Sequence, residues 1–256
     1  MRVDMCNNLL DCYKKIFYRE VGEGVPVVFL HGNTASSKMF EPLLHFYQEH
    51  AHIVLIDFLG NGKSERIKKF PHDLYQEEAK QTIALIEHLN LKETSLVGTS
   101  GGAWAAVNAG LMRPDLVKGV VADSFSGRAF GDGFAEALEK ERKAAKQDEW
   151  GRGFYQWCQG EDWEQVVDSD TEALLQCARE NLPLFVKPIS ELKPRLLLLG
   201  SLEDTMVGID MRKEYEEIAR QTGGQIHLFR KGDHPAIASN AKEAAEVILD
   251  FLGREE

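Results

Sequence analysis

The sequence predicts an α/β protein in which a mostly parallel central sheet carries helices on both faces. Short runs of nearly all apolar residues alternate with helical patterns along most of the chain, and the runs end in glycine-rich or polar turns. Strands that are apolar throughout are typical of parallel sheets, because crossover helices bury them from both sides. The length of 256 residues is enough for one sizeable core of this class.

Each element is predicted from its own residues. Apolar residues fill nearly every position of the predicted strands, which cover residues 25–30, 52–57, 94–98, 117–122, 195–199 and 225–229. Apolar or small residues recur at helical spacing in the predicted helices, which cover residues 36–50, 74–89, 103–111, 210–221 and 241–252. The first of these helices begins at a serine, Ser36 or Ser37, a residue type that caps helix N-termini.

The alternation lapses between residues 126 and 190 and then resumes. Residues 135–146 are rich in helix formers, and the rest of this segment has no run of β-branched residues of strand length. The sequence therefore predicts a core domain of residues 1–125 and 191–256. A helical cap over residues 126–190, which we call the insertion, interrupts this core between two strands.

Polar side chains follow the predicted strands. Right-handed crossovers bring the carboxyl ends of parallel strands to one edge of the sheet, where open α/β sheets bind ligands. The residues that we expect at this edge are His31, Asp57, Ser100, Asp123, Asp204 and His234.

Composition and charge exclude several classes of protein. Hydrophobic residues make up 43% of the chain, and 30 Lys and Arg against 41 Asp and Glu leave a net charge of −11. This acidic balance gives no footprint for nucleic acid and disfavours anionic lipid. The chain has no apolar run long enough for a membrane helix, and its first residues lack the apolar stretch of a signal peptide. We therefore expect a cytoplasmic protein without a nucleic-acid or membrane partner.

The cysteines and histidines do not indicate a metal site. Cys6, Cys12, Cys158 and Cys177 are dispersed, without a CxxC pair or clustered Cys/His ligands, and no HExxH motif occurs. Four such cysteines are expected to remain thiols in a reducing compartment. We expect neither a metal nor another cofactor.

The sharpest motif is Gly98-Thr99-Ser100-Gly101-Gly102, a G-x-S-x-G between a predicted strand and a helix of small residues. In this context the serine lies on a strained strand-to-helix turn, and the flanking glycines let the chain pass closely. The helix N-terminus behind it offers free N–H groups where an oxyanion would form. This motif favours Ser100 as a nucleophile.

From about residue 17 to residue 252, apart from the insertion, the chain resembles the α/β-hydrolase family. Four further segments match family motifs in order, namely 31–33, 57–64, 200–207 and 232–234. The resemblance implies that Ser100 attacks a carbonyl, His234 is its base and Asp204 orients the imidazole, in the chain order expected for this fold. It also implies an oxyanion hole built from the backbone N–H groups of Asn33 and Gly101.

The other residues of these motifs have structural interpretations. We expect His31 to tie the oxyanion loop together and Asp57 to cap a turn. For the triad acid, two carboxylates stay open beside Asp204. Glu203 lies at the commoner family offset from Gly200, and Asp123 lies where some relatives carry the acid.

The residue on the strand-to-helix turn, which the family calls the nucleophile elbow, also separates reaction types. Residues 31–37 are similar to a loop of haloalkane dehalogenases, which place an aspartate at this elbow. Because Ser100 cannot supply a carboxylate that displaces halide, we do not expect dehalogenation or the usual epoxide hydrolysis.

The resemblance implies hydrolysis of a small carboxylic ester or related acyl substrate. The aromatic residues of the insertion and its lack of a basic cluster favour an uncharged, partly apolar substrate. The same triad also supports C–C bond hydrolysis, lactone opening, amide cleavage and perhydrolysis, so these alternatives stay open, as does the oligomeric state. A non-catalytic ligand-binding receptor of the same fold is the alternative from another class.

Overall fold

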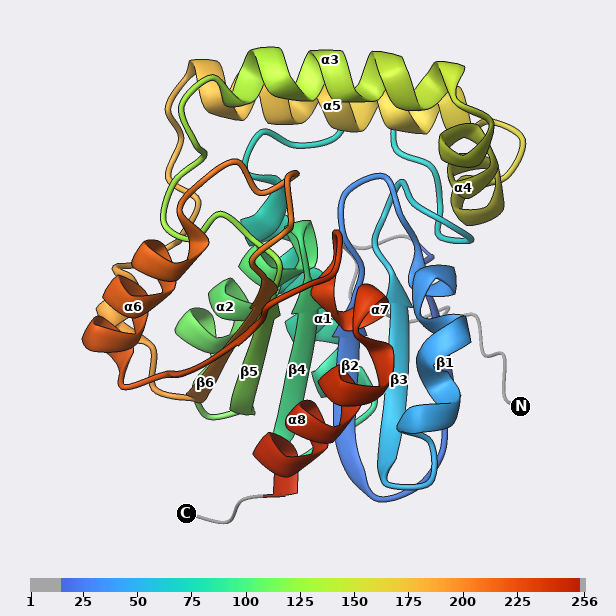
Figure 1. Cartoon of the computed structure of the whole chain (residues 1–256). Coiled ribbons are helices and arrows are strands. Elements are labelled where there is room, and N and C mark those ends of the chain that lie inside the picture. The colour runs from blue at the N-terminus through green and yellow to red at the C-terminus, as the bar shows by residue number, and fades with distance from the viewer. Residues whose placement is uncertain (1–14, 254–256) are drawn as a thin grey trace.

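The computed structural model describes residues 15–253, and a seven-stranded sheet forms its centre (Figure 1). The strand order is β1-β3-β2-β4-β5-β6-β7. The strands are β1 (Phe17–Val21), β2 (Val25–Leu30), β3 (Ala51–Asp57), β4 (Thr94–Thr99), β5 (Val117–Asp123), β6 (Arg195–Ser201) and β7 (Gln225–Phe229). β1 pairs antiparallel with β3, and every other neighbouring pair is parallel. The prediction of a mostly parallel central sheet is confirmed.

Helices bury both faces of this sheet. Alternate strand residues contribute to two apolar clusters, so that Val28 and Leu30 lie in one and Val27 and Phe29 in the other. The first cluster takes in α1 (Leu74–His88), α2 (Gly101–Met112) and α6 (Met211–Thr222). The second takes in η1 (Ser37–Phe46), α7 (Ala236–Ser239) and α8 (Ala241–Gly253). The strands are therefore covered from both sides, which explains their nearly continuous apolar runs.

Three elements differ from the sequence prediction. The helix expected over 36–50 is the 3-10 helix η1, and Pro42 inside it lacks the N–H that a regular α-helix would use there. β1 was not predicted, because this edge strand carries polar side chains among its five residues. α7 was not predicted either, since four residues are too few to show a helical period.

The insertion, residues 126–190, contains three α-helices and no strand, and the structure describes all of it. The helices are α3 (Phe134–Gln147), α4 (Glu149–Gln159) and α5 (Trp163–Arg179), and Figure 1 shows them lying across one end of the sheet. This end is where the strands finish, because the insertion bonds to the loops that follow β2 and β3. Ser36 Oγ donates to the carbonyl of Cys158 at 2.9 Å, and Gln159 Nε2 donates to Asn61 Oδ1 at 3.0 Å.

The aromatic residues of the insertion divide by burial. Trp163 is 5% exposed, stacks on Tyr155 with ring centroids 5.7 Å apart, and shares a small cluster with Val167. Trp150 is 78% exposed and Trp157 is 39% exposed. Trp163 therefore packs the helices of the insertion against one another.

This packing predicts a large loss of stability for Trp163→Ala. Truncating a buried tryptophan leaves a cavity and costs about 3–5 kcal/mol of unfolding free energy. The matched control is Trp150→Ala, which removes the same side chain from an exposed position and is expected to cost less than about 0.5 kcal/mol. Urea denaturation of both variants measures the difference, and equal losses would contradict the packing role.

Two further expectations concern the cysteines and membrane-spanning helices. Cys158 and Cys177 are buried free thiols, whereas Cys6 and Cys12 lie outside the described residues. Among residues 15–253, no helix combines the length and the apolarity that a membrane span requires.

Candidate active site

Ser100 lies on a tight turn between β4 and α2. Its φ of 54° and ψ of −119° are strained for a residue with a side chain, and the strain is held by close packing on both sides. A Cβ at Gly98 would lie 2.1 Å from the carbonyl oxygen of Gly102, and one at Gly102 would lie 2.2 Å from that of Leu30. Only glycine fits these two positions. The sequence therefore presents a partly exposed Ser100 at the first turn of a helix.

The structure brings Asp204 and His234 together at the same edge. Asp204 follows β6, His234 follows β7, and Asp204 Oδ2 lies 2.8 Å from His234 Nδ1. The Asp204 side chain is fully buried, and its Oδ1 accepts a hydrogen bond from the backbone N–H of Met206 at 2.9 Å. A carboxylate accepts hydrogen bonds, so Nδ1 carries the ring proton and Nε2 is left free to accept one.

The other two acid candidates lie differently. Asp123 is buried, accepts hydrogen bonds from Ser124 Oγ at 3.0 Å and from the N–H of Ile237 at 3.4 Å, and has its pKa raised to about 7 by burial. Glu203 is exposed. Of the three carboxylates, Asp204 is the one whose hydrogen bond to His234 the structure shows.

Residues 123 and 124 connect the turn at Ser100 to the loop that carries His234. The backbone N–H of Ser100 donates to the carbonyl of Asp123 at 2.7 Å. On the other side, the N–H of Ala236 donates to Ser124 Oγ at 2.8 Å. Both loops are thus fixed to the end of β5, which stands between β4 and β6 in the sheet.

Asn33 lies against the first residue of α2. A Cβ at Gly101 would lie 3.1 Å from the backbone nitrogen of Asn33 and 2.2 Å from its Oδ1. The two residues predicted to form the oxyanion hole are therefore neighbours, although they come from different strand ends.

His31 and Asp57 have the structural roles expected from the sequence. His31 Nε2 accepts from the N–H of Phe58 at 3.1 Å, so its Nδ1 donates to the carbonyl of Gly32 at 2.9 Å. Burial lowers the pKa of His31 and keeps it neutral for this bonding. Asp57 accepts from the N–H groups of Ser37 and Lys63 at 2.7 and 2.8 Å. Both interpretations are confirmed.

A buried polar cluster beside Asn33 was missed by the sequence analysis. Asp170 on α5 is 1% exposed and its Oδ2 accepts from Asn33 Nδ2 at 3.0 Å. Tyr75 on α1 donates from its hydroxyl to Asn33 Oδ1 at 3.2 Å. Arg142 on α3 places Nη2 at 3.8 Å from Asp170 Oδ1. The available signal was a charged residue on an apolar helix face, since Asp170 shares its face with Val166 and Ala173.

The raised pKa of Asp123 predicts a pH-dependent stability. Because burial raises this pKa from 3.8 to about 7, the folded protein holds the proton that the unfolded chain has already released. The contribution of Asp123 to the free energy of unfolding therefore falls as the pH rises from about 4 to about 7, by up to about 4 kcal/mol, and levels off above that range.

Asp123→Asn keeps the shape of the side chain without the charge and is expected to remove this fall. The variant and the parent protein should be equally stable near pH 4, and the variant should be more stable at pH 8. Urea denaturation at both pH values measures the change, with the exposed Asp132→Asn as the matched control. An unchanged difference between pH 4 and pH 8 would contradict the assignment.

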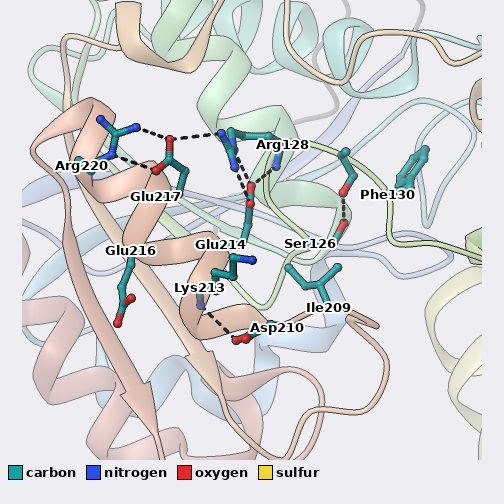
Figure 2. Close-up of a pocket in the computed structure, with 11 residues that line it drawn as sticks. Ser126, Arg128, Phe130, Ile209, Asp210, Lys213, Glu214, Glu216, Glu217 and Arg220 are labelled. Atoms are coloured by element: carbon teal, nitrogen blue, oxygen red, sulfur yellow. Dashed lines mark hydrogen bonds and ion pairs between the residues drawn. The ribbon is translucent and has the colours of Figure 1, made fainter.

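A separate cleft of about 830 Å³ opens between the first residues of the insertion and α6 (Figure 2). None of the residues predicted for the triad and the oxyanion hole lines it. Four of its charged side chains pair with one another, since Arg128 Nε lies 2.8 Å from Glu214 Oε1 and Arg220 Nε lies 2.9 Å from Glu217 Oε2 (Figure 2). This cleft is therefore not formed by the residues predicted to carry the chemistry.

The model of the alpha/beta hydrolase family matches residues 27–247. The chain belongs to this family. Within residues 15–253, this alpha/beta hydrolase has no group of three or more His, Cys, Asp or Glu side chains placed to hold a metal ion.

Curated relatives match about two fifths of this alpha/beta hydrolase. (E)-2-((N-methylformamido)methylene)succinate hydrolase of Acinetobacter baylyi is 32% identical over 101 residues, which are 40% of this chain and 38% of the relative. 2-(Acetamidomethylene)succinate hydrolase of Mesorhizobium japonicum is 36% identical over 110 residues, 42% of this chain and 38% of the relative. Haloalkane dehalogenase 2 of Mycobacterium tuberculosis is 29% identical over 107 residues, 42% and 37% of the two chains. The chain thus spans just over a third of the length of these relatives.

Solved structures share the fold over nearly the whole chain. The structure of E-2-(acetamidomethylene)succinate hydrolase has a TM-score of 0.72 and 22% identity, covering 94% of this chain and 96% of its own. An esterase from Exiguobacterium antarcticum has the same TM-score and coverage at 19% identity. Identities this low establish a common fold, and specificity resides in the site.

Proposed function

We propose that this alpha/beta hydrolase is a serine hydrolase that cleaves a small carboxylic ester or related acyl substrate through an acyl-enzyme. The observation that carries the proposal is the 2.8 Å contact between Asp204 and His234, two residues 30 positions apart. It lies at the sheet edge where β4 presents Ser100 on a strained turn. An oriented base at the sheet edge that also carries a partly exposed serine hydroxyl is the arrangement expected for an activated serine nucleophile.

The proposed reaction assigns one task to each residue. Ser100 Oγ attacks the substrate carbonyl and its proton passes to His234 Nε2. The backbone N–H groups of Gly101 and Asn33 stabilise the oxyanion. His234 then protonates the leaving alcohol, and water enters by the same path in reverse to release the acid and free Ser100. Asp204 stabilises the imidazolium throughout, without being protonated itself.

We further propose that the insertion is a cap that sets substrate choice. Its first residues place aromatic rings one helical turn from Ser100, where Trp104 of α2 packs against Phe130 with ring centroids 5.8 Å apart. Phe130, which also lines the cleft beside α6, stacks on Phe134 with ring centroids 4.0 Å apart. These rings favour a partly apolar acyl group. The tryptophan that packs the insertion, Trp163, has no such role in this proposal.

Amide hydrolysis is the second candidate. Two of the relatives described above, those of Acinetobacter baylyi and Mesorhizobium japonicum, are named as hydrolases of amidomethylene succinates. The same triad cleaves an amide when His234 protonates a leaving nitrogen in place of an alcohol oxygen. Dehalogenation is not proposed, because the elbow residue is Ser100.

The deciding experiment measures turnover and labelling together. Nitrophenyl esters of increasing acyl length and 2-(acetamidomethylene)succinate are offered in parallel, and a fluorophosphonate probe reports an activated serine. Turnover of the esters supports the first candidate, and selective turnover of the amide supports the second. Tight saturable binding of a ligand, with neither turnover nor labelling, would favour a receptor and overturn both.

A further inference from the structure

Asp170 is a buried carboxylate that the proposed reaction does not use. It lies on α5, in the insertion, yet its Oδ2 accepts a 3.0 Å hydrogen bond from Asn33 Nδ2 in the core. Burying a carboxylate costs several kcal/mol unless charges and hydrogen bonds offset the loss of water. Burial raises the pKa of Asp170, while Arg142 and the bond from Asn33 oppose this rise. The cost of burying this carboxylate indicates that Asp170 has a role in addition to packing.

The side chain of Asn33 is held from two sides. Tyr75 on α1 donates to Asn33 Oδ1 at 3.2 Å, and burial raises the pKa of Tyr75, so its hydroxyl stays a donor. Asp170 Oδ2 accepts the amide N–H on the other side. With one donor and one acceptor assigned, the amide has a single orientation.

The fixed side chain of Asn33 and its backbone nitrogen lie against the same residue of α2. A Cβ built on Gly101 would lie 2.2 Å from Asn33 Oδ1 and 3.1 Å from its backbone nitrogen. Loss of a hydrogen bond to the amide would free the side chain to repack against Gly101, in the same contact that holds the backbone nitrogen. A small displacement of that nitrogen would matter, because oxyanion donors act only when they are aimed at the developing charge.

We propose that Asp170 is a positioning residue that fixes the N–H of Asn33 in the oxyanion hole. The geometry of the hole is then set by the insertion as well as by the core. This inference rests on the proposed function of Ser100 and Asn33.

The test is a double-mutant cycle between Asp170→Ala and Asn33→Ala, measured with p-nitrophenyl acetate. Asp170→Ala is expected to lower kcat about 10- to 100-fold with KM changed less than about threefold, since a misplaced oxyanion donor weakens the transition state only. In the Asn33→Ala background, where the amide is absent, the same substitution is expected to change kcat less than about twofold. Equal losses in both backgrounds, or no loss in the parent protein, would overturn the proposal.

Two controls separate this role from a general loss of structure. Asp168→Ala removes an exposed aspartate from the same helix, one that pairs with Lys146, and is expected to leave kcat unchanged. Asp170→Ala removes the buried charge partner of Arg142, which keeps its ion pair with Glu141 at 2.8 Å, so the double variant Asp170→Leu with Arg142→Met removes both buried charges together. If Asp170→Ala does not fold, this pair is expected to show the same kcat loss, and a kcat equal to the parent's would again overturn the proposal.

Ser100→Ala serves as the reference for the proposed function. If Ser100→Ala keeps the activity, the serine hydrolase itself is wrong. If Ser100→Ala is inactive and the Asp170 variants behave like the parent protein, only the positioning role is wrong.

Discussion

Ser100→Ala is expected to lower kcat by at least about 10,000-fold and to abolish labelling by a fluorophosphonate. The reason is chemical, because alanine leaves His234 with no hydroxyl to deprotonate. The fold should persist, since the strained turn depends on Gly98 and Gly102 rather than on the serine side chain. Steady-state kinetics and mass spectrometry of the labelled protein measure the two effects.

The matched control is Ser190→Ala, at an exposed position in the 3-10 helix η2 (Ile189–Glu191). This variant is expected to match the parent protein in turnover and labelling. Labelling of the Ser100→Ala variant at another serine would show that the nucleophile has been misidentified.

Asp204→Asn is expected to lower kcat by about 10,000-fold with the protein still folded. The amide can donate as well as accept, so it no longer selects the tautomer in which His234 Nδ1 carries the proton. It also withdraws the charge that stabilises the imidazolium, which the carboxylate supplies across 2.8 Å. Kinetics with the ester substrate and urea denaturation test activity and folding separately.

The two other carboxylates are the internal controls for this prediction. Glu203→Gln, one residue earlier and exposed, is expected to change kcat less than about twofold. Asp123→Asn is expected to lower kcat less than about tenfold, because Asp123 forms its hydrogen bonds with Ser124 and Ile237. A large loss for Asp123→Asn together with an active Asp204→Asn would transfer the role of the acid to Asp123.

Much of the sheet was predictable because burial on two faces leaves a direct trace in the sequence. The apolar runs of β2 to β7 follow from this burial. The polar residues after the strands lie together because parallel strands end at the same edge of the sheet. That rule anticipates that Asp204 and His234 lie at the same edge, whereas their pairing was implied by the family resemblance. The helix expected over 36–50 was less predictable, because apolar spacing does not distinguish a 3-10 helix from an α-helix.

The polar cluster around Asn33 was not predictable from the sequence. Asp170, Tyr75 and Arg142 come from three helices, and their meeting depends on how the insertion lies across the sheet. Neither periodicity nor a local motif encodes that placement. A charged residue among apolar neighbours on α5 is a signal that Asp170 has a partner, but the sequence analysis did not use it, and the signal does not identify the partner.

The polar bonds between the insertion and the loops after β2 and β3 have a consequence for engineering. A chimera that received residues 126–190 from another member of the family would lose the partners of Ser36 and Asn61, namely the carbonyl of Cys158 and the side chain of Gln159. The recipient loops would then have unpaired polar groups at their contact with the insertion. Productive exchange therefore requires that the loops after β2 and β3 travel with the insertion as one cassette, so the unit of recombination is discontinuous in the sequence.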